Sequence, residues 1–178
     1  MRRLWIGGLL IAVLAWLVWM WAGQRGKARE EPIAADSLTV GVRAVRLYFG
    51  AASGDSLVSE PRELVEVSGL HERVAALVGE LDRGPRGRGV ALLPAGTSVL
   101  HVYLDDRGLM TLDLSGAFRQ GFRGGSTAEA WALASLARTL GANLPEVKRL
   151  QIVCAGRPIA SLGGHLPLDQ PLDVSDWP

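Results

Sequence analysis

The sequence has 178 residues, of which 48% are hydrophobic, 21% charged and 6% aromatic. This length allows one ordinary domain plus an accessory segment and excludes two large domains, because domains usually contain roughly 100 to 200 residues. The 19 basic and 18 acidic residues nearly cancel, so the chain lacks the charge excess typical of a protein that binds nucleic acid. The only cysteine, Cys154, excludes a disulfide within the chain.

The apolar residues are concentrated near the amino terminus. Residues 4–22 form an uncharged run that contains four of the six tryptophans. As a helix this run would be roughly 28 Å long, close to the thickness of a bilayer core, and tryptophan favours the two membrane interfaces. We therefore predict a transmembrane helix over residues 4–22 that binds membrane lipid, preceded by a stub at residues 1–3. A cleaved signal peptide is the alternative, but its apolar core is normally about 7 to 15 residues long.

A linker and the first half of a domain follow the apolar run. Residues 23–37 have the small, charged and proline-containing composition of a linker. We expect the domain at residues 38–172 and a tail at residues 173–178. Residues 40–49 and 57–67 carry β-favouring side chains, which predicts two paired strands. Val74, Leu77, Val78 and Leu81 have the spacing of one helix face, which predicts a helix over residues 71–81 that Gly84 and Pro85 end.

The second half of the domain contains a hairpin, a helix and a buried strand. Residues 99–104 and 109–114 flank turn-forming residues that start at Asp105 and end at Gly108, which predicts a β-hairpin. Ser126 and Glu129 have capping-box spacing, so we expect a second helix to begin there and Gly141 to end it. Residues 147–155 are an apolar run typical of a buried strand.

Together these elements predict an α+β fold. We expect a single mixed or antiparallel sheet of about five strands with two helices packed on it, preceded by one transmembrane helix.

No residue is predicted to be catalytic or to bind a metal or a cofactor. His71, His101 and His165 are at least 30 residues apart, and the sequence has neither a closely spaced metal-binding motif nor a G-x-S-x-G elbow. Cys154 lies in an apolar run and is interpreted as a core residue. We therefore expect no enzymatic activity.

Two further groups of residues have plain explanations. The backbone amides and arginines of residues 84–89 could cradle a phosphate, but this segment lacks the lysine and hydroxyl of a P-loop. We interpret it as a solvent-exposed loop. Asp105, Asp106 and Asp113 lie at or near the hairpin, where turn formation explains the first two.

A series of short motifs follows in order along the domain: Leu47 to Phe49, Leu57-Val58 with Glu60-Pro61-Arg62, Gly84-Pro85, Leu93 to Thr97, Asp113 to Ser115, Gly125-Ser126, Thr139-Leu140 and Gly156 to His165. This ordered series resembles the GerMN family of sporulation and spore germination domains, which occur in bacterial envelope proteins. The resemblance implies an extracytoplasmic α/β domain without catalytic residues, associated with scaffolding or assembly of envelope complexes.

We therefore expect a single-pass protein of the cell membrane, with its amino terminus in the cytoplasm and its domain outside. Its expected partners are membrane lipid, envelope proteins or copies of itself, and not nucleic acid. One alternative is an envelope sensor or cell-wall ligand-binding domain, which a pocket with convergent polar groups would favour. Another is an envelope hydrolase, which would gather titratable residues with perturbed pKa values in a cleft.

Overall fold

The computed structural model describes residues 15–21 and 41–177, which belong to two different units of the chain. Residues 15–21 are helical, and the side chains of Trp16 and Trp19 in this helix are exposed. Within the described residues, no helix has both the length and the apolar character needed to span a membrane. The predicted stub, most of the predicted transmembrane helix and the predicted linker lie outside the described residues.

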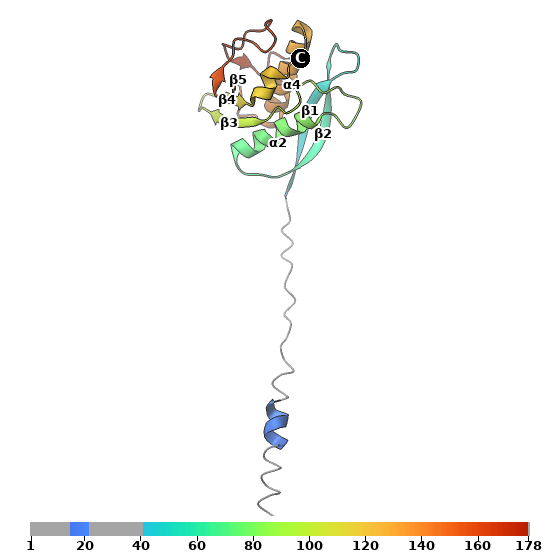
Figure 1. The fold of residues 1–178 in the computed structure, drawn as a ribbon, viewed down its shortest axis with the longest axis vertical. Coiled ribbons are helices and arrows are strands. Elements are labelled where there is room, and N and C mark those ends of the chain that lie inside the picture. The colour runs from blue at the N-terminus through green and yellow to red at the C-terminus, as the bar shows by residue number, and fades with distance from the viewer. Residues whose placement is uncertain (1–14, 22–40, 178) are drawn as a thin grey trace, which may run out of the picture. The chain divides into compact units, whose positions relative to one another are not determined.

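Residues 41–177 form an α+β domain, which confirms the predicted fold class. Helix α4 lies along β1, and α2 contacts α4, β1 and β3 (Figure 1). The elements are, in chain order, β1 (Val42–Gly50), β2 (Leu57–Val65), α2 (Leu70–Arg83), β3 (Val99–Leu104), β4 (Leu109–Leu114), α3 (Gly116–Gln120), α4 (Ser126–Asn143), β5 (Arg149–Cys154), β6 (Arg157–Pro158) and β7 (Leu172–Asp173).

The strands form two sheets, so the predicted single sheet is wrong. Strands β1 and β2 make a two-stranded antiparallel sheet, in register from Val42 opposite Val65 to Gly50 opposite Leu57. The second sheet has the order β3-β4-β5-β6, and β7 also pairs with β5. Within it β3 and β4 are antiparallel, as predicted for the hairpin, whereas β4 and β5 are parallel.

The two sheets stay separate because side chains of α4 occupy the outer edge of β1. The N–H of Tyr48 donates to Thr139 Oγ1 at 3.1 Å, and the Ser135 hydroxyl donates to the Tyr48 carbonyl. The N–H of Arg46 donates to Asn143 Oδ1 at 3.0 Å, and Asn143 Nδ2 donates to the Arg46 carbonyl at 2.7 Å. These three polar residues of α4, four positions apart, satisfy main-chain groups that a neighbouring strand would otherwise bind.

The boundaries of α4 differ from those predicted. Gly125 is the N-cap and no side chain caps the helix, so Ser126 and Glu129 do not form a capping box. The helix also continues through Gly141 to Asn143. A side chain at Gly141 would press against Val174, at 3.3 Å, so this glycine provides room for packing and does not end the helix.

One hydrophobic core lies between the helices and the two sheets. It takes side chains from the inner face of β1, from α2 and α4, and from one face of β4 and β5. Cys154, which the sequence places in the core, is 7% exposed. The largest fully buried side chains are Phe49, Phe118, Leu47, Leu81, Met110, Leu112, Leu114, Leu133, Leu136, Leu140, Leu144 and Leu150.

Candidate functional site

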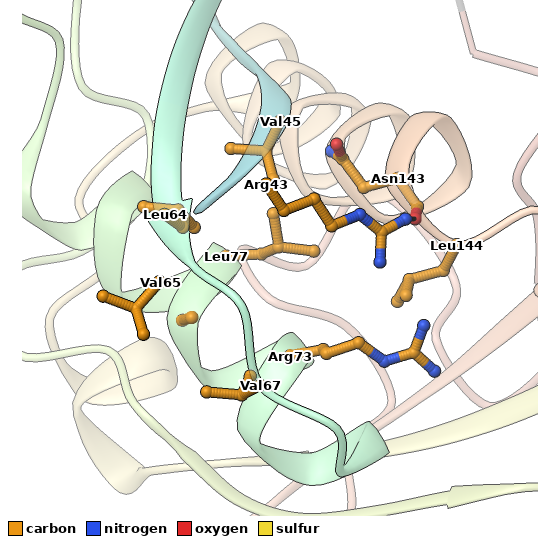
Figure 2. Close-up of a pocket in the computed structure, with 10 residues that line it drawn as sticks. Arg43, Val45, Leu64, Val65, Val67, Arg73, Leu77, Asn143 and Leu144 are labelled. Carbon is orange, nitrogen blue, oxygen red and sulfur yellow. Dashed lines mark hydrogen bonds between the residues drawn. The ribbon is translucent and has the colours of Figure 1, made fainter. Parts of the chain in front are cut away.

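A small apolar hollow lies where the open end of the β1–β2 hairpin meets α2 and the end of α4 (Figure 2). Its volume is about 30 Å³, which is enough to hold a water molecule. The lining residues are Val45, Leu64, Val65, Val67, Ala76, Leu77 and Leu144, together with the polar residues Arg43, Arg73 and Asn143. We call these ten residues the hairpin hollow.

The alternation of the two strands positions the hollow at the domain surface. Arg43 and Leu64 are paired across the hairpin on its inner face, next to Val45. Val42 and Val65 form the neighbouring cross-strand pair, which faces the other side of the hairpin, and the two residues are 62% and 58% exposed. Because exposed apolar side chains beside a hollow are typical of interaction sites, this end of the hairpin is the candidate functional site.

Two arginines give the hairpin hollow its charge. Arg43 Nη2 donates to the Asn143 carbonyl at 2.9 Å, one of the last carbonyls of α4. Arg73 Nη2 lies 3.1 Å from Glu146 Oε1, whereas Arg73 Nε is buried and has no hydrogen-bond partner among the described residues. Figure 2 shows both guanidinium groups extending toward Leu144. No carboxylate within residues 41–177 forms an ion pair with Arg43.

A buried ion network fixes the glycine- and arginine-rich loop that the sequence offered as a phosphate cradle. Arg62, 5% exposed, binds Glu80 and donates to Glu60 Oε1 at 2.7 Å and to the Gly84 carbonyl at 2.8 Å. The Glu60 carboxylate in turn accepts the N–H groups of Arg86 and Gly87, at 3.1 Å. The amides that would hold a phosphate therefore already bind an internal carboxylate.

The network keeps its carboxylates ionised. Burial alone would raise the pKa of Glu80, but the hydrogen bond and positive charge of Arg62, with a further contribution from Arg83, lower that pKa below its ordinary value. Burial would likewise raise the pKa of Glu60, and the hydrogen bonds from Arg62 and the loop amides lower it.

Glu129 is a second buried carboxylate, held by main-chain groups alone. It is 0% exposed and accepts the N–H groups of Leu162 and His165, each at 2.9 Å. The amides of Gly163 and Leu166 also help to lower its pKa. Burial would raise the pKa of Glu129, but these amides outweigh burial and lower the pKa. Glu129 therefore fastens residues 162–166 to α4, a role that the sequence did not reveal.

The histidines do not converge on a common site. His101 Nδ1 lies 3.2 Å from Asp113 Oδ2, but the His101 side chain is 86% exposed, and the other Asp113 oxygen accepts the Gly156 N–H. His71 lies in the first turn of α2, and the main chain of His165 binds Glu129. In the part of the chain that the structure describes, no group of three or more histidine, cysteine or acidic side chains could hold a metal ion.

Asp105 acts in the β3–β4 turn as the sequence predicts. Asp105 Oδ1 accepts the N–H groups of Arg107 and Leu109, at 2.9 and 2.8 Å, and Gly108 has a positive φ of 80°. These contacts stabilise the turn.

Cys154 lies beside a shallow surface depression next to Arg119 and Arg157. Its Sγ is 3.3 Å from the Ser115 carbonyl. This contact is in keeping with a weak thiol donor packed in a core, as the sequence suggested.

The fold and these contacts define an α+β domain with an N-terminal hairpin, and comparison with known proteins identifies its family. The sequence model of the family described as sporulation and spore germination matches residues 46–160. The chain belongs to this family, whose domains are also called GerMN domains. No curated protein matches the sequence.

Solved structures share the fold at low sequence identity. A putative lipoprotein from Clostridium perfringens has 23% identity and a TM-score of 0.54, over 77% of this chain and 91% of that one. The tandem GerMN domains of the sporulation protein GerM from Bacillus subtilis have 17% identity and a TM-score of 0.61, over 76% of this chain and 48% of that one. The first GerMN domain of GerM has 18% identity and a TM-score of 0.55, over 74% and 97%.

Proposed function

We propose that this chain is a single-pass membrane protein that presents its GerMN domain outside the cytoplasm, where the domain binds envelope proteins or copies of itself. One observation carries the proposal: a domain of the sporulation and germination family follows an apolar run rich in tryptophan, residues 4–22, in the same chain. The similar fold of a protein described as a putative lipoprotein supports a place beside a membrane.

Tethering gives this arrangement a physical rationale. A domain confined near one membrane surface meets partners on that surface at a raised effective concentration, so that weak contacts are sufficient for assembly. The exposed pair Val42 and Val65, beside the hairpin hollow, offers an apolar contact of this kind. We propose that the domain acts as a scaffold through this end of the hairpin.

We also propose that the domain is not an enzyme. A general acid or base works best with a pKa near the working pH. The pKa values of the half-buried Glu60 and of the buried Glu80 and Glu129 are all lowered, and each carboxylate is bound by Arg62 or by main-chain amides. These groups support a structural role and argue against the hydrolase alternative.

A cell-wall ligand-binding or sensor domain is the second candidate. Arg43 and Arg73 favour it, because both line the apolar hollow and carry guanidinium groups (Figure 2). A sensor would bind glycan or a wall fragment at this site, whereas a scaffold would bind proteins.

In-cell photo-crosslinking separates the two candidates. A crosslinking amino acid at Val42 or Val65 should capture discrete envelope proteins, whereas the same amino acid at Asp106, in the β3–β4 turn, is the control for non-specific capture. Recovery of glycan alone from the hairpin positions would reject the scaffold.

The topology has an independent test. A reporter enzyme that is active only outside the cytoplasm, fused after Pro178, should be active in cells. Activity of the matching cytoplasmic reporter at the same position would reject the proposed orientation.

A further inference from the structure

We propose that two copies of this chain pair along β3 to form a twofold-symmetric dimer. The outer edge of β3 in one copy lies antiparallel to the same edge in the other, which joins the two larger sheets into one. This inference rests on the proposed scaffold function, because tethering to a membrane raises the effective concentration of the copies. It goes further by naming a second copy as the partner and β3 as the strand that binds it.

Strand β3 is an edge strand with free main-chain groups. It stands at one end of the sheet order β3-β4-β5-β6. The N–H of Asp105 donates to the Leu109 carbonyl at 3.0 Å, which sets the alternation of hydrogen bonds between β3 and β4. The main chain of Tyr103 therefore bonds to β4, whereas that of Val102 and Leu104 points to the outer edge. Neither Val102 nor Leu104 makes another main-chain hydrogen bond within residues 41–177.

The edge of β3 lacks the side-chain contacts that close the edge of β1. Asn143 and Thr139 of α4 bind the main chain of β1. Helix α2 contacts β3, and the side chains of Val102 and Leu104 pack against the core. In the described part of the domain, however, no side chain of α2 forms a hydrogen bond with the main chain of β3. The outer edge of β3 thus has unpaired donors and acceptors that another strand can bind.

The sequence of β3 also does not protect this edge. Its six residues, VLHVYL, include no proline, lysine, arginine, aspartate or glutamate. Edge strands of monomeric domains usually carry such residues, because they prevent pairing with another chain. Other edges of this domain do so, since β2 contains Pro61 and β6 ends at Pro158. The exception at β3 indicates an edge that pairs with another strand.

One register uses every free group of this edge. Val102 of each copy lies opposite Leu104 of the other, and each such pair exchanges both of its main-chain hydrogen bonds. A shift by two residues would place Leu104 opposite the bulge at residues 99–101 in one direction, or Val102 opposite the β3–β4 turn in the other. Both shifts would lose hydrogen bonds, so the register with Tyr103 on the twofold axis is favoured.

The same register matches the side chains on the exposed face of β3. Tyr103, which is 67% exposed, lies opposite Tyr103 of the second copy, in a pair whose side chains are close together. His101, with its side chain 86% exposed, lies opposite Asp105 of the second copy. Aromatic pairs and pairs of a basic with an acidic side chain both stabilise neighbouring strands. This self-complementarity favours a second copy over an unrelated strand, and the pairing closes at two chains because it occupies both edges.

Disulfide trapping of the full chain in detergent micelles tests the pairing. The background variant is Cys154→Ala, which removes the native thiol. Tyr103→Cys would then place two thiols across the twofold axis with their Cα atoms about 4.5 Å apart, within the range of a disulfide. Mild oxidation should convert most of this variant into a covalent dimer. The matched control is Val90→Cys, at a residue that is 48% exposed and pairs with Gly50, not with β3. A dimer yield no higher than that of the control would overturn the proposal.

Charge variants test the same register without a covalent bond. Tyr103→Lys removes the aromatic pair and places two like charges opposite each other, so the dimer dissociation constant should rise about tenfold in analytical ultracentrifugation. A mixture of Tyr103→Lys and Tyr103→Glu chains should pair more tightly than either variant alone. Because Tyr103 is exposed, thermal unfolding of both variants should match that of the native chain. A folded Tyr103→Lys chain that dimerises as tightly as the native chain would overturn the proposal, and so would a mixture that gains no affinity.

The dimer and the proposed function can fail separately. Cytoplasmic activity of the reporter together with a trapped dimer would reject only the orientation. Capture of envelope proteins at Val42 or Val65 without a trapped dimer would refute only the pairing of β3. Asp106 lies beside this edge, so capture of a second copy at Asp106 in cells would support the pairing. Trapping of Tyr103→Cys in cells on a different envelope protein, and not on a second copy, would overturn it.

Discussion

Two of the buried carboxylates, Glu80 and Glu129, are held in different ways, by a counter-charge and by main-chain amides. Glu80 in α2 faces the guanidinium of Arg62, and Glu129 in α4 faces only main-chain amides of residues 162–166. The Glu80 site depends on another charge, which is itself buried and must be paired. The Glu129 site depends on the backbone of one loop, so a single side chain orders five residues without a counter-charge.

The largest expected effect comes from removing the counter-charge at the Glu80 site. Arg62→Ala leaves Glu80, which is 3% exposed, without its buried partner, and should lower the free energy of unfolding by about 3 to 5 kcal/mol. Chemical denaturation of the full chain measures this loss. Replacing both Arg62 and Glu80 with methionine should cost much less, and an equal cost for the double variant would show that the charges were not the cause.

The Glu129 site should lose less when its charge is removed. Glu129→Gln keeps one acceptor oxygen but turns an amide group toward the loop amides, so we expect a loss of about 1 to 3 kcal/mol. The exposed residue Glu63 in β2 provides the control, since Glu63→Gln should leave the midpoint of denaturation unchanged. An unchanged free energy of unfolding in Glu129→Gln would mean that residues 162–166 stay ordered without the carboxylate.

The pH dependence of stability should reveal both sites. Their pKa values are lowered in the folded state, so each carboxylate contributes stability that is fully present above the ordinary value of 4.5. This contribution is lost as the pH falls below 4.5 toward the lowered folded values. Thermal unfolding of the full chain at successive pH values should show a decline on acidification. The decline should be smaller in Glu129→Gln, and an identical decline would exclude Glu129 as a source.

The smallest effect is expected at the exposed rim of the Arg62 network. The Arg86 side chain is 72% exposed, and its Nη2 lies 3.7 Å from Glu80. Exposed ion pairs contribute little, so Arg86→Gln should change the free energy of unfolding by less than about 0.5 kcal/mol. A larger loss of unfolding free energy, measured by chemical denaturation, would mean that Arg86 also compensates the buried charge of Glu80.

Patterns of neighbouring residues in the sequence predicted the helices and turns that depend mainly on contacts between residues close in the chain. The apolar spacing from Val74 to Leu81 predicted α2, and the turn residues from Asp105 to Gly108 predicted the hairpin of β3 and β4. The family was also predictable, because its motifs are short segments in a fixed order. In these cases neighbouring residues carry the whole signal.

Contacts between distant residues explain what the sequence did not reveal. The separation of the two sheets depends on Asn143 binding Arg46, 97 positions away. Glu129 has the spacing of a capping residue but binds a loop 33 to 36 positions later. The hairpin hollow combines both strands of the first hairpin with α2 and the end of α4. A polar residue at helical spacing is normally interpreted as solvent-exposed, so none of these roles has a local signature.

The helix that covers β1 also limits how copies of this domain can associate. The N–H and C=O groups of Arg46 point toward α4. Pro61 lies opposite Arg46, so its main-chain groups point away from β1, toward the outer edge of β2. Proline has no N–H to offer an added strand. Helix α4 therefore prevents another strand from pairing with β1, and Pro61 interrupts the hydrogen bonds that another strand would need to pair with β2. Many such domains can therefore lie close together without fusing their sheets into fibres.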